Sequence, residues 1–159
     1  TCRSADLITA CAAEDLQAFQ DHFNPSAELG IVPNGFVPTA GRPARPDPGG
    51  PKRLVFLGSG HQPNVEAVEI IRSSLAPKMP EVEFHIVGSA SPAGRSGNVV
   101  AHGVVDRETK QRLLTSATAA LNPMISGSGS SLKVADLADH GVPLLSTSLG
   151  ARGFDLEPG

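Results

Sequence analysis

The chain has 159 residues, of which 40% are hydrophobic and 18% are charged, and its formal net charge is -3. This composition is typical of one globular domain and differs from that of disordered, collagen-like or repeat proteins. Charged residues are spread along the sequence, so no electrostatic stripe is present that would bind a nucleic-acid backbone or an anionic membrane. The apolar runs are far shorter than the roughly 18 residues of a membrane span, and we expect a soluble protein.

The cysteine content and the N-terminus indicate an intracellular fragment. Cys2 and Cys11 are the only cysteines, and neither a Cys-x-x-Cys pair nor a histidine at metal-ligand spacing accompanies them. We expect two free, at least partly buried thiols and a cytoplasmic location, because disulfides are rare in reducing compartments. Thr1 is preceded by no initiating Met and followed by no secretory signal pattern, which predicts a piece of a longer chain.

The first predicted elements are a strand, a helix and a second short strand. The strand lies in Ala5–Ala10, and the helix carries apolar residues at three- and four-residue spacing. A brief extended stretch at residues 29–32 leads to a turn at 33–35. From Pro38 to Pro51, repeated prolines and glycines predict a linker with neither helix nor central strand. The apolar residues of the helix are Leu16, Phe19 and Phe23.

Beyond Lys52, short apolar runs alternate with helical patterns, which predicts strand–helix units. We expect an open, Rossmann-like parallel sheet with helices on both of its faces, and its first strand in the centre. Ser89–Asn98 is rich in Gly, Ser and Pro and is expected to be a loop with at most one short helical turn. The predicted strands are Leu54–Leu57, Val82–Val87, Val99–Val105, Ala119–Leu121 and Val142–Ser146.

Three helices are predicted to connect these strands. The first begins near Pro63 and places its apolar residues on one face. The second spans Asp106–Ala117, with Asp106 as N-cap. The third spans Ser130–His140 and ends at Gly141. The residues expected to face the sheet are Val65, Val68, Ile71 and Leu75 in the first helix, Leu113 and Leu114 in the second, and Leu132, Ala135 and either Ala138 or Leu137 in the third.

A loop at the carboxyl end of the first strand of this sheet is a candidate ligand site. Gly58-Ser59-Gly60-His61 follows that strand and precedes a helix, and glycines there let the backbone approach a ligand at the positive end of the helix dipole. A tight strand-to-helix turn needs glycine for steric reasons as well. Both explanations of the loop remain open.

A second loop carries more chemical information. Ser126-Gly127-Ser128-Gly129-Ser130-Ser131 opens the last helix, and Lys133 and Asp136 follow three residues apart, on nearly one face. Exposed amides at a helix N-terminus together with a lysine suit a diphosphate, and a nearby carboxylate suits the hydroxyl groups of a ribose. The alternative is a flexible loop beside a solvated Lys–Asp pair.

Other chemistries have no supporting pattern. The sequence contains no Gly-x-Ser-x-Gly nucleophile elbow and no phosphate-binding loop that ends in Gly-Lys-Ser or Gly-Lys-Thr. No Asp-x-Asp pair is present to hold a metal against a diphosphate. We therefore expect no metal site and no cofactor, and no residue is identified as a catalytic base.

An ordered set of motifs resembles the C-terminal half of family-4 glycosyltransferases of the GT-B fold. Ile31-Val32-Pro33-Asn34-Gly35-Phe36 is similar to the start of the family's donor domain, and Leu54-Val55-Phe56-Leu57-Gly58 to its first strand and glycine. The strongest similarity runs from Leu121 to Gly141, and Ser146–Gly153 continues it. The resemblance implies a domain that binds a nucleotide-diphosphate sugar.

The resemblance also assigns roles to individual residues. Asp136 takes the place of the family's ribose-binding Glu, and Gly103 and Val104 would present backbone to the nucleobase. Ser128 stands where many members carry a Glu that helps to bind the transferred sugar. The Arg/Lys pair that many members place after the first strand is absent from Ser59–Asn64, so Lys133 and the helix N-terminus would take over its role.

The resemblance implies a division of the chain and a function. Residues 1–37 would be the end of an acceptor domain and a crossover segment, 38–51 a linker, and 52–159 a truncated donor-binding domain. The complete protein would transfer a sugar from a nucleotide-diphosphate sugar to an acceptor that the sequence does not identify. A nucleotide-sugar epimerase of similar fold and a non-catalytic nucleotide-binding module remain as alternatives.

Overall fold

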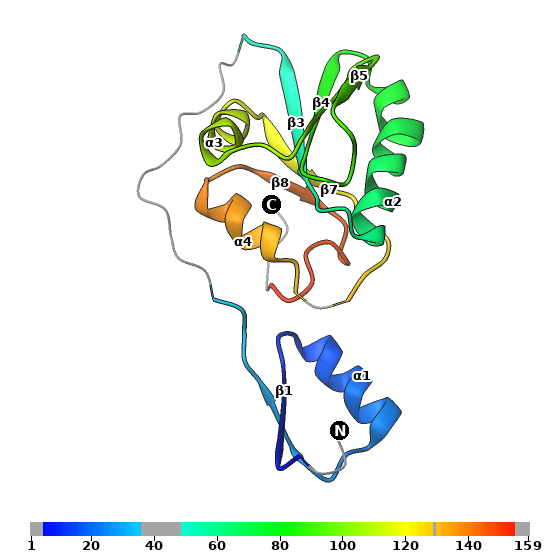
Figure 1. Cartoon of the computed structure of the whole chain (residues 1–159), viewed down its shortest axis with the longest axis vertical. Helices are drawn as coiled ribbons and strands as arrows, with labels where there is room; N and C mark the ends of the chain where they lie inside the picture. The colour runs from blue at the N-terminus through cyan, green and yellow to red at the C-terminus, as the bar shows by residue number, and fades with distance from the viewer. Residues whose placement is uncertain (1–4, 36–48, 129, 155–159) are drawn as a thin grey trace.

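A computed structural model describes residues 5–35, 49–128 and 130–154 of the chain (Figure 1). Six strands form the main sheet in the order β5-β6-β4-β3-β7-β8, and all neighbouring pairs except β5 and β6 are parallel. The predicted parallel sheet with its first strand in the centre is confirmed. The strands are β3 (Lys52–Leu57), β4 (Val82–Val87), β5 (Gly94–Ser96), β6 (Val99–Gly103), β7 (Ala119–Asn122) and β8 (Leu144–Ser146).

Strand β5 corrects the prediction that Ser89–Asn98 is a loop without a strand. Ser96 pairs with Val99 in an antiparallel hairpin, so Gly97 and Asn98 form a two-residue turn. Gly97 has a φ of 58°, a conformation that glycine adopts without strain and that such hairpin turns require. The Gly-Asn dipeptide in front of an apolar strand is the sequence signal for this hairpin.

Helices cover both faces of the sheet, as predicted, and each face has its own apolar core (Figure 1). Helix α2 (Gln62–Ile70) continues as a π-helical turn, η2 (Ile71–Leu75), and a 3-10 turn, η3 (Ala76–Lys78), and it packs on one face. Helices α3 (Arg107–Thr115) and α4 (Leu132–Asp139) pack on the other face. The carboxyl ends of the parallel strands therefore open between helices from both layers.

The ends of α3 and α4 follow the predicted capping signals. The Asp106 carboxylate accepts a hydrogen bond from the Thr109 amide at 2.7 Å, and this bond lowers the pKa of Asp106. Gly141, with a φ of 62°, ends α4. Within α4 the prediction for Leu132 is wrong, because its side chain is 57% exposed. The residues of α4 buried under the sheet are Val134, Ala135 and Leu137.

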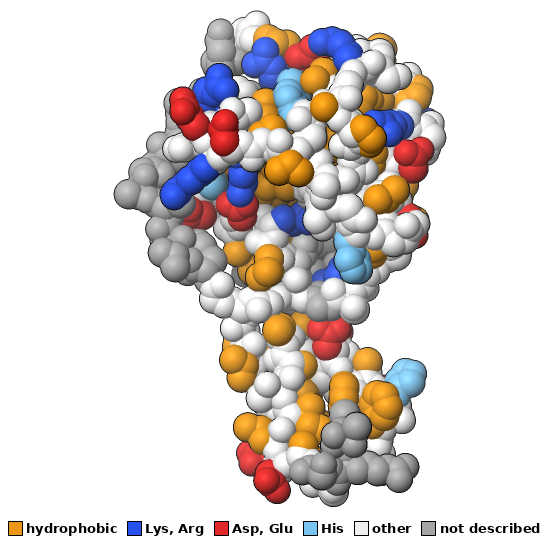
Figure 2. Space-filling model, in the orientation of Figure 1, with side chains coloured by type: hydrophobic (Ala, Val, Ile, Leu, Met, Phe, Trp, Pro, Cys, Tyr) orange, Lys and Arg blue, Asp and Glu red, His pale blue; other side chains and the backbone are white. Residues whose placement is uncertain are grey.

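The N-terminal residues form a small separate layer. The predicted strand, helix and extended stretch are present as β1 (Leu7–Ala10), α1 (Ala13–Phe23) and β2 (Glu28–Ile31). The structure adds that β1 and β2 pair in parallel. No residue of α1 is buried, and several large apolar side chains of this unit are exposed (Figure 2).

The predicted linker lies mostly in residues 36–48, outside the described part of the chain. Cys11 is a free thiol but is exposed rather than buried, because the β1–α1 turn lies at the surface.

The described residues contain no helix long and apolar enough to cross a membrane. Within the same residues, no group of three or more His, Cys, Asp and Glu side chains could hold a metal ion. On the face shown in Figure 2, basic and acidic side chains are interspersed over the larger domain.

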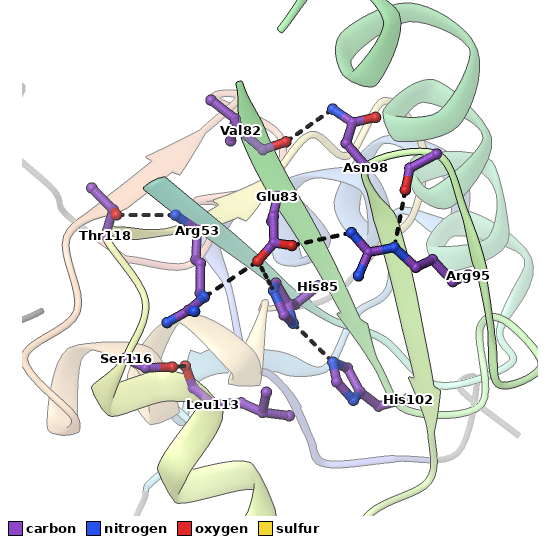
Figure 3. Close-up of polar contacts among 11 residues, drawn as sticks. Arg53, Val82, Glu83, His85, Arg95, Asn98, His102, Leu113, Ser116 and Thr118 are labelled. Atoms are coloured by element: carbon purple, nitrogen blue, oxygen red, sulfur yellow. Dashed lines mark hydrogen bonds and ion pairs between the residues drawn. The ribbon is translucent and has the colours of Figure 1, made fainter. Parts of the chain in front are cut away.

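A polar cluster lies between β3, β4, β5 and β6, beginning at the amino ends of β3 and β4 (Figure 3). The Glu83 carboxylate accepts a hydrogen bond from Arg95 at 3.2 Å and another from Arg53 at 3.4 Å. The His85 and His102 rings stack with centroids 5.1 Å apart, and their facing nitrogens are 2.9 Å apart. Burial would raise the pKa of Glu83, but its hydrogen bonds with Arg95 and Arg53 and its contact with His85, whose Nε2 lies 3.6 Å from the Glu83 Oε2, outweigh this and lower it. Burial lowers the pKa of both histidines.

Candidate functional site

A cleft of about 860 Å³ lies at the carboxyl ends of the parallel strands. Its volume is within the range of ligand-binding pockets, and its place beside the central strand β3 is where open α/β sheets bind ligands. Loops after β3, β4, β6 and β7 and side chains of α3 and α4 line it. Ten of the thirteen predicted site residues are in this lining: Gly58, Ser59, His61, Val104, Gly127, Ser128, Ser130, Ser131, Lys133 and Asp136.

The remaining three predicted residues do not line the cleft or are not described. The Gly60 amide donates to the Ser89 Oγ at 2.8 Å, which ties this residue to the next loop. Gly103 accepts a hydrogen bond from the Gly88 amide at 2.8 Å. Gly129 lies outside the described residues. The two predicted loops therefore meet at one cleft, although they lie far apart in the sequence.

Close backbone packing explains the glycine of the first loop. The Gly58 amide donates to the Val87 carbonyl at 2.9 Å, and the Gly58 carbonyl accepts from the Ala90 amide at 3.1 Å. A Cβ at Gly58 would lie 2.6 Å from the Phe56 ring, and a Cβ at Gly88 would lie 2.1 Å from the Gly58 carbonyl oxygen. Of the two explanations left open, the steric one is thus sufficient for Gly58.

Lys133 projects from the first turn of α4 into the cleft. Its Nζ donates to the Asn64 Oδ1 at 2.6 Å and lies 4.5 Å from the centroid of the Phe56 ring. Burial, and to a lesser extent the charge of Arg152, lower the pKa of Lys133 to about 8. Asn64 also donates to the Ser59 Oγ at 3.2 Å, so this side chain links the first loop to the lysine.

Arg152 is a second cation in the cleft that the residue-by-residue prediction missed. Its guanidinium donates to the Ser128 carbonyl at 2.6 Å and to the Leu149 carbonyl at 2.8 Å, while its Nε is buried without a partner. The segment that carries it is anchored by the buried Asn122 at the end of β7, which donates to the Gly150 carbonyl at 2.7 Å. Arg152 therefore lies under the Gly/Ser-rich loop.

One amide of that loop is less free than predicted. The Ser131 amide, which was expected to face an anion, donates to the Arg152 carbonyl at 3.3 Å. The Ser126 hydroxyl donates to the Glu66 carboxylate of α2, which fixes the start of the loop. Positive charge in this part of the cleft thus comes mainly from the side chains of Lys133 and Arg152.

Asp136 lies one turn beyond Lys133 and also lines the cleft, so the prediction that both share a face is confirmed. Its Oδ2 forms an ion pair with the Lys110 Nζ of α3. The His140 Nδ1 donates to the Asp136 backbone carbonyl at 2.7 Å and lies 3.5 Å from the carboxylate Oδ1. Nothing in the local sequence indicated the contact with Lys110.

The charges of the cleft are therefore unbalanced. Among the described residues, no carboxylate forms an ion pair with Lys133 or Arg152, whereas Asp136 is already paired with Lys110. Burial is the main cause of the lowered pKa of Lys133, and the repulsion between Lys133 and Arg152 adds to this cost. An anion bound between them would relieve it.

Comparison with known proteins places this geometry in a family. The family described as Glycosyl transferases group 1 matches residues 51–156. A comparison with curated protein sequences finds no match.

Solved structures of similar fold include two transferases and a synthase. The lipopolysaccharide outer core galactosyltransferase WaaB in its apo form has a TM-score of 0.66 at 16% identity, covering 89% of this chain and 43% of that chain. Sucrose-phosphate synthase from Thermosynechococcus elongatus has a TM-score of 0.64 at 12% identity, covering 92% and 42%. The pneumococcal O-GlcNAc transferase GtfA in complex with UDP and GlcNAc has a TM-score of 0.61 at 14% identity, covering 90% and 30%.

At these identities the structural matches establish the fold alone, and the chain corresponds to one half of a GT-B fold. It spans less than half the length of each of these proteins. The sequence match covers about two thirds of the chain, and together with the cleft at the strand ends it confirms the resemblance. The chain belongs to the family of glycosyl transferases group 1.

Proposed function

We propose that the cleft binds the nucleotide diphosphate of a sugar donor, with the diphosphate between Lys133 and Arg152. The observation that carries this proposal is the pair of cations without an acidic partner among the described residues. A diphosphate supplies the opposite charge, and hydrogen bonds from charged donors to phosphate oxygens are stronger than those from neutral ones. The two cations take the place of the Arg/Lys pair that is missing after β3.

The rest of the donor extends from this anchor in a defined direction. Asp136 lies one helical turn beyond Lys133 and offers carboxylate oxygens to the ribose hydroxyl groups. Val104, directly after β6, is 81% exposed and lines the same cleft, so its backbone is accessible to a nucleobase. The transferred sugar would lie on the other side of the diphosphate, towards Ser128 and His61.

Binding is tested by measuring the melting temperature and by calorimetry with UDP, GDP and ADP and with the corresponding nucleosides. A ligand that binds only the folded state raises the melting temperature by mass action. Replacing Arg152 with Gln should weaken diphosphate binding by about 1.5–3 kcal/mol, the contribution of a hydrogen bond to a charged group, and leave the weak nucleoside binding unchanged. Equal losses for nucleoside and nucleoside diphosphate would contradict the phosphate role.

For the complete protein we propose sugar transfer from a nucleotide-diphosphate donor to an acceptor. Lys133 and Arg152 would stabilise the negative charge that develops on the departing diphosphate. Release of nucleoside diphosphate that depends on an added acceptor would identify a transferase. Isomerisation of the donor without release would identify an epimerase, and binding without either reaction would identify a nucleotide-binding module.

A further inference from the structure

Lys110 is a cation of the cleft that the diphosphate site does not use. It projects from α3 and pairs with a carboxylate of α4, whereas the other two cations have no such partner among the described residues. Both members of the pair are about one-third exposed, at 33% for Lys110 and 35% for Asp136. The pair is therefore open to a ligand in the cleft.

The contacts of Asp136 leave it oriented but not saturated. Lys110 binds its Oδ2, and the His140 Nδ1 lies 3.5 Å from its Oδ1. The His140 Nδ1 already donates to a backbone carbonyl at 2.7 Å. Because an ionised carboxylate has about four acceptor positions, both oxygens can still accept hydrogen bonds from the hydroxyl groups of a ligand.

We propose that Lys110 is a positioning residue for recognition of the ribose diol. It fixes the side-chain rotamer of Asp136, so that both carboxylate oxygens face the 2′- and 3′-hydroxyl groups. The inference rests on the proposed function, since it concerns how the same nucleotide is selected. A carboxylate that is ordered before binding loses less conformational entropy when the diol binds, and this gain is absent for a ligand that lacks one of the hydroxyls.

The proposal predicts that removal of Lys110 weakens discrimination between sugars rather than binding in general. The probes are the nucleoside diphosphate among UDP, GDP and ADP that raises the melting temperature most and its 2′-deoxy counterpart, with dissociation constants measured by calorimetry. The wild type should prefer the ribose form by about 10- to 150-fold, the range of a charge-assisted hydrogen bond. Lys110→Met should reduce this preference at least about fivefold, and Lys110→Arg should retain most of it.

Two controls separate positioning from general electrostatics. Arg107→Met removes an exposed cation from the same helix, and it should leave the preference unchanged. In an Asp136→Asn background, Lys110→Met should have little further effect, because the two residues act through one interaction. If Lys110→Met does not melt cooperatively, Lys110→Gln replaces it and the same ratio decides.

Each remaining outcome overturns a defined part of the reasoning. Equal loss of affinity for both ligands in Lys110→Met would make Lys110 a phosphate-attracting charge and end the positioning role, as would an unchanged preference. A wild type that binds both forms equally would leave the diphosphate site intact but remove the ribose role of Asp136 and Lys110. A wild type that binds none of the three diphosphates would refute the proposed function itself.

Discussion

We predict that the charge of Lys133, which binds the diphosphate, destabilises the folded protein when no ligand is bound. The Lys133→Met variant tests this prediction directly. Methionine has nearly the same length and shape but no charge, so the substitution keeps most of the packing against Phe56 and Met124. It removes the cost of holding an ammonium group in a partly dehydrated cleft beside Arg152. We expect the variant to be more stable than the wild type without ligand, and to bind the diphosphate poorly.

The magnitude follows from the pKa of Lys133. Its lowering from 10.5 to about 8 corresponds to about 3 kcal/mol, because each pKa unit is equivalent to about 1.36 kcal/mol. The Lys133→Met variant would lack the hydrogen bond to Asn64 and the contact of the charge with Phe56, which together offset about 2 kcal/mol. A net gain of about 1 kcal/mol remains, equivalent to a rise of about 2–4 °C in melting temperature for a chain of this size.

The sign of the effect depends on pH. Since the pKa is lower in the folded state, the cost is fully present below pH 8 and disappears as the pH rises towards 10.5. The stabilisation of Lys133→Met, measured by urea unfolding, should therefore be clear at pH 7, fall as the pH rises above 8, and reverse before pH 10.5, because the wild type regains more than the net difference. The exposed Lys78→Met is the matched control and should change neither stability nor binding. A variant that is less stable than the wild type at pH 7, or that binds the diphosphate as well, would refute the reasoning.

Three further predictions concern pH and backbone packing. Affinity of the wild type for the responding nucleoside diphosphate should fall by up to about tenfold per pH unit above pH 8, measured by calorimetry, because Lys133 must then take up a proton on binding. Gly88→Ala should lower the free energy of unfolding, measured in urea, by about 2–4 kcal/mol, since its Cβ would overlap a backbone carbonyl at a φ of 111°. Gly97→Ala, with no atom within 4 Å of its Cβ, should lower it by only about 1 kcal/mol. Because the pKa values of His85 and His102 are lowered in the folded state, the wild type should lose more stability than His102→Gln as the pH falls through 6.5; parallel curves would contradict this.

Much of the fold could be predicted because its signals are local. Alternating apolar runs and 3.6-residue periodicity identified β3, α2 and their successors, and Asp106 and Gly141 marked helix ends by their own chemistry. The relation between Lys133 and Asp136 was equally local, since residues three apart on a helix share a face. The exposed Leu132 was mispredicted because apolarity alone does not distinguish a residue that faces the sheet from one that lines a cleft.

Local patterns in the sequence were enough to predict the strand–helix order apart from β5, the family, and the two loops that meet at the cleft. Which charged groups meet in the cleft depends on the tertiary structure, because the groups that contact one another come from distant parts of the chain. Arg152 reaches the loop only through the anchoring of its segment by Asn122, and Lys110 meets Asp136 only because α3 and α4 pack on one face of the sheet. Such contacts depend on how elements pack, and neither periodicity nor residue spacing within one element carries that information.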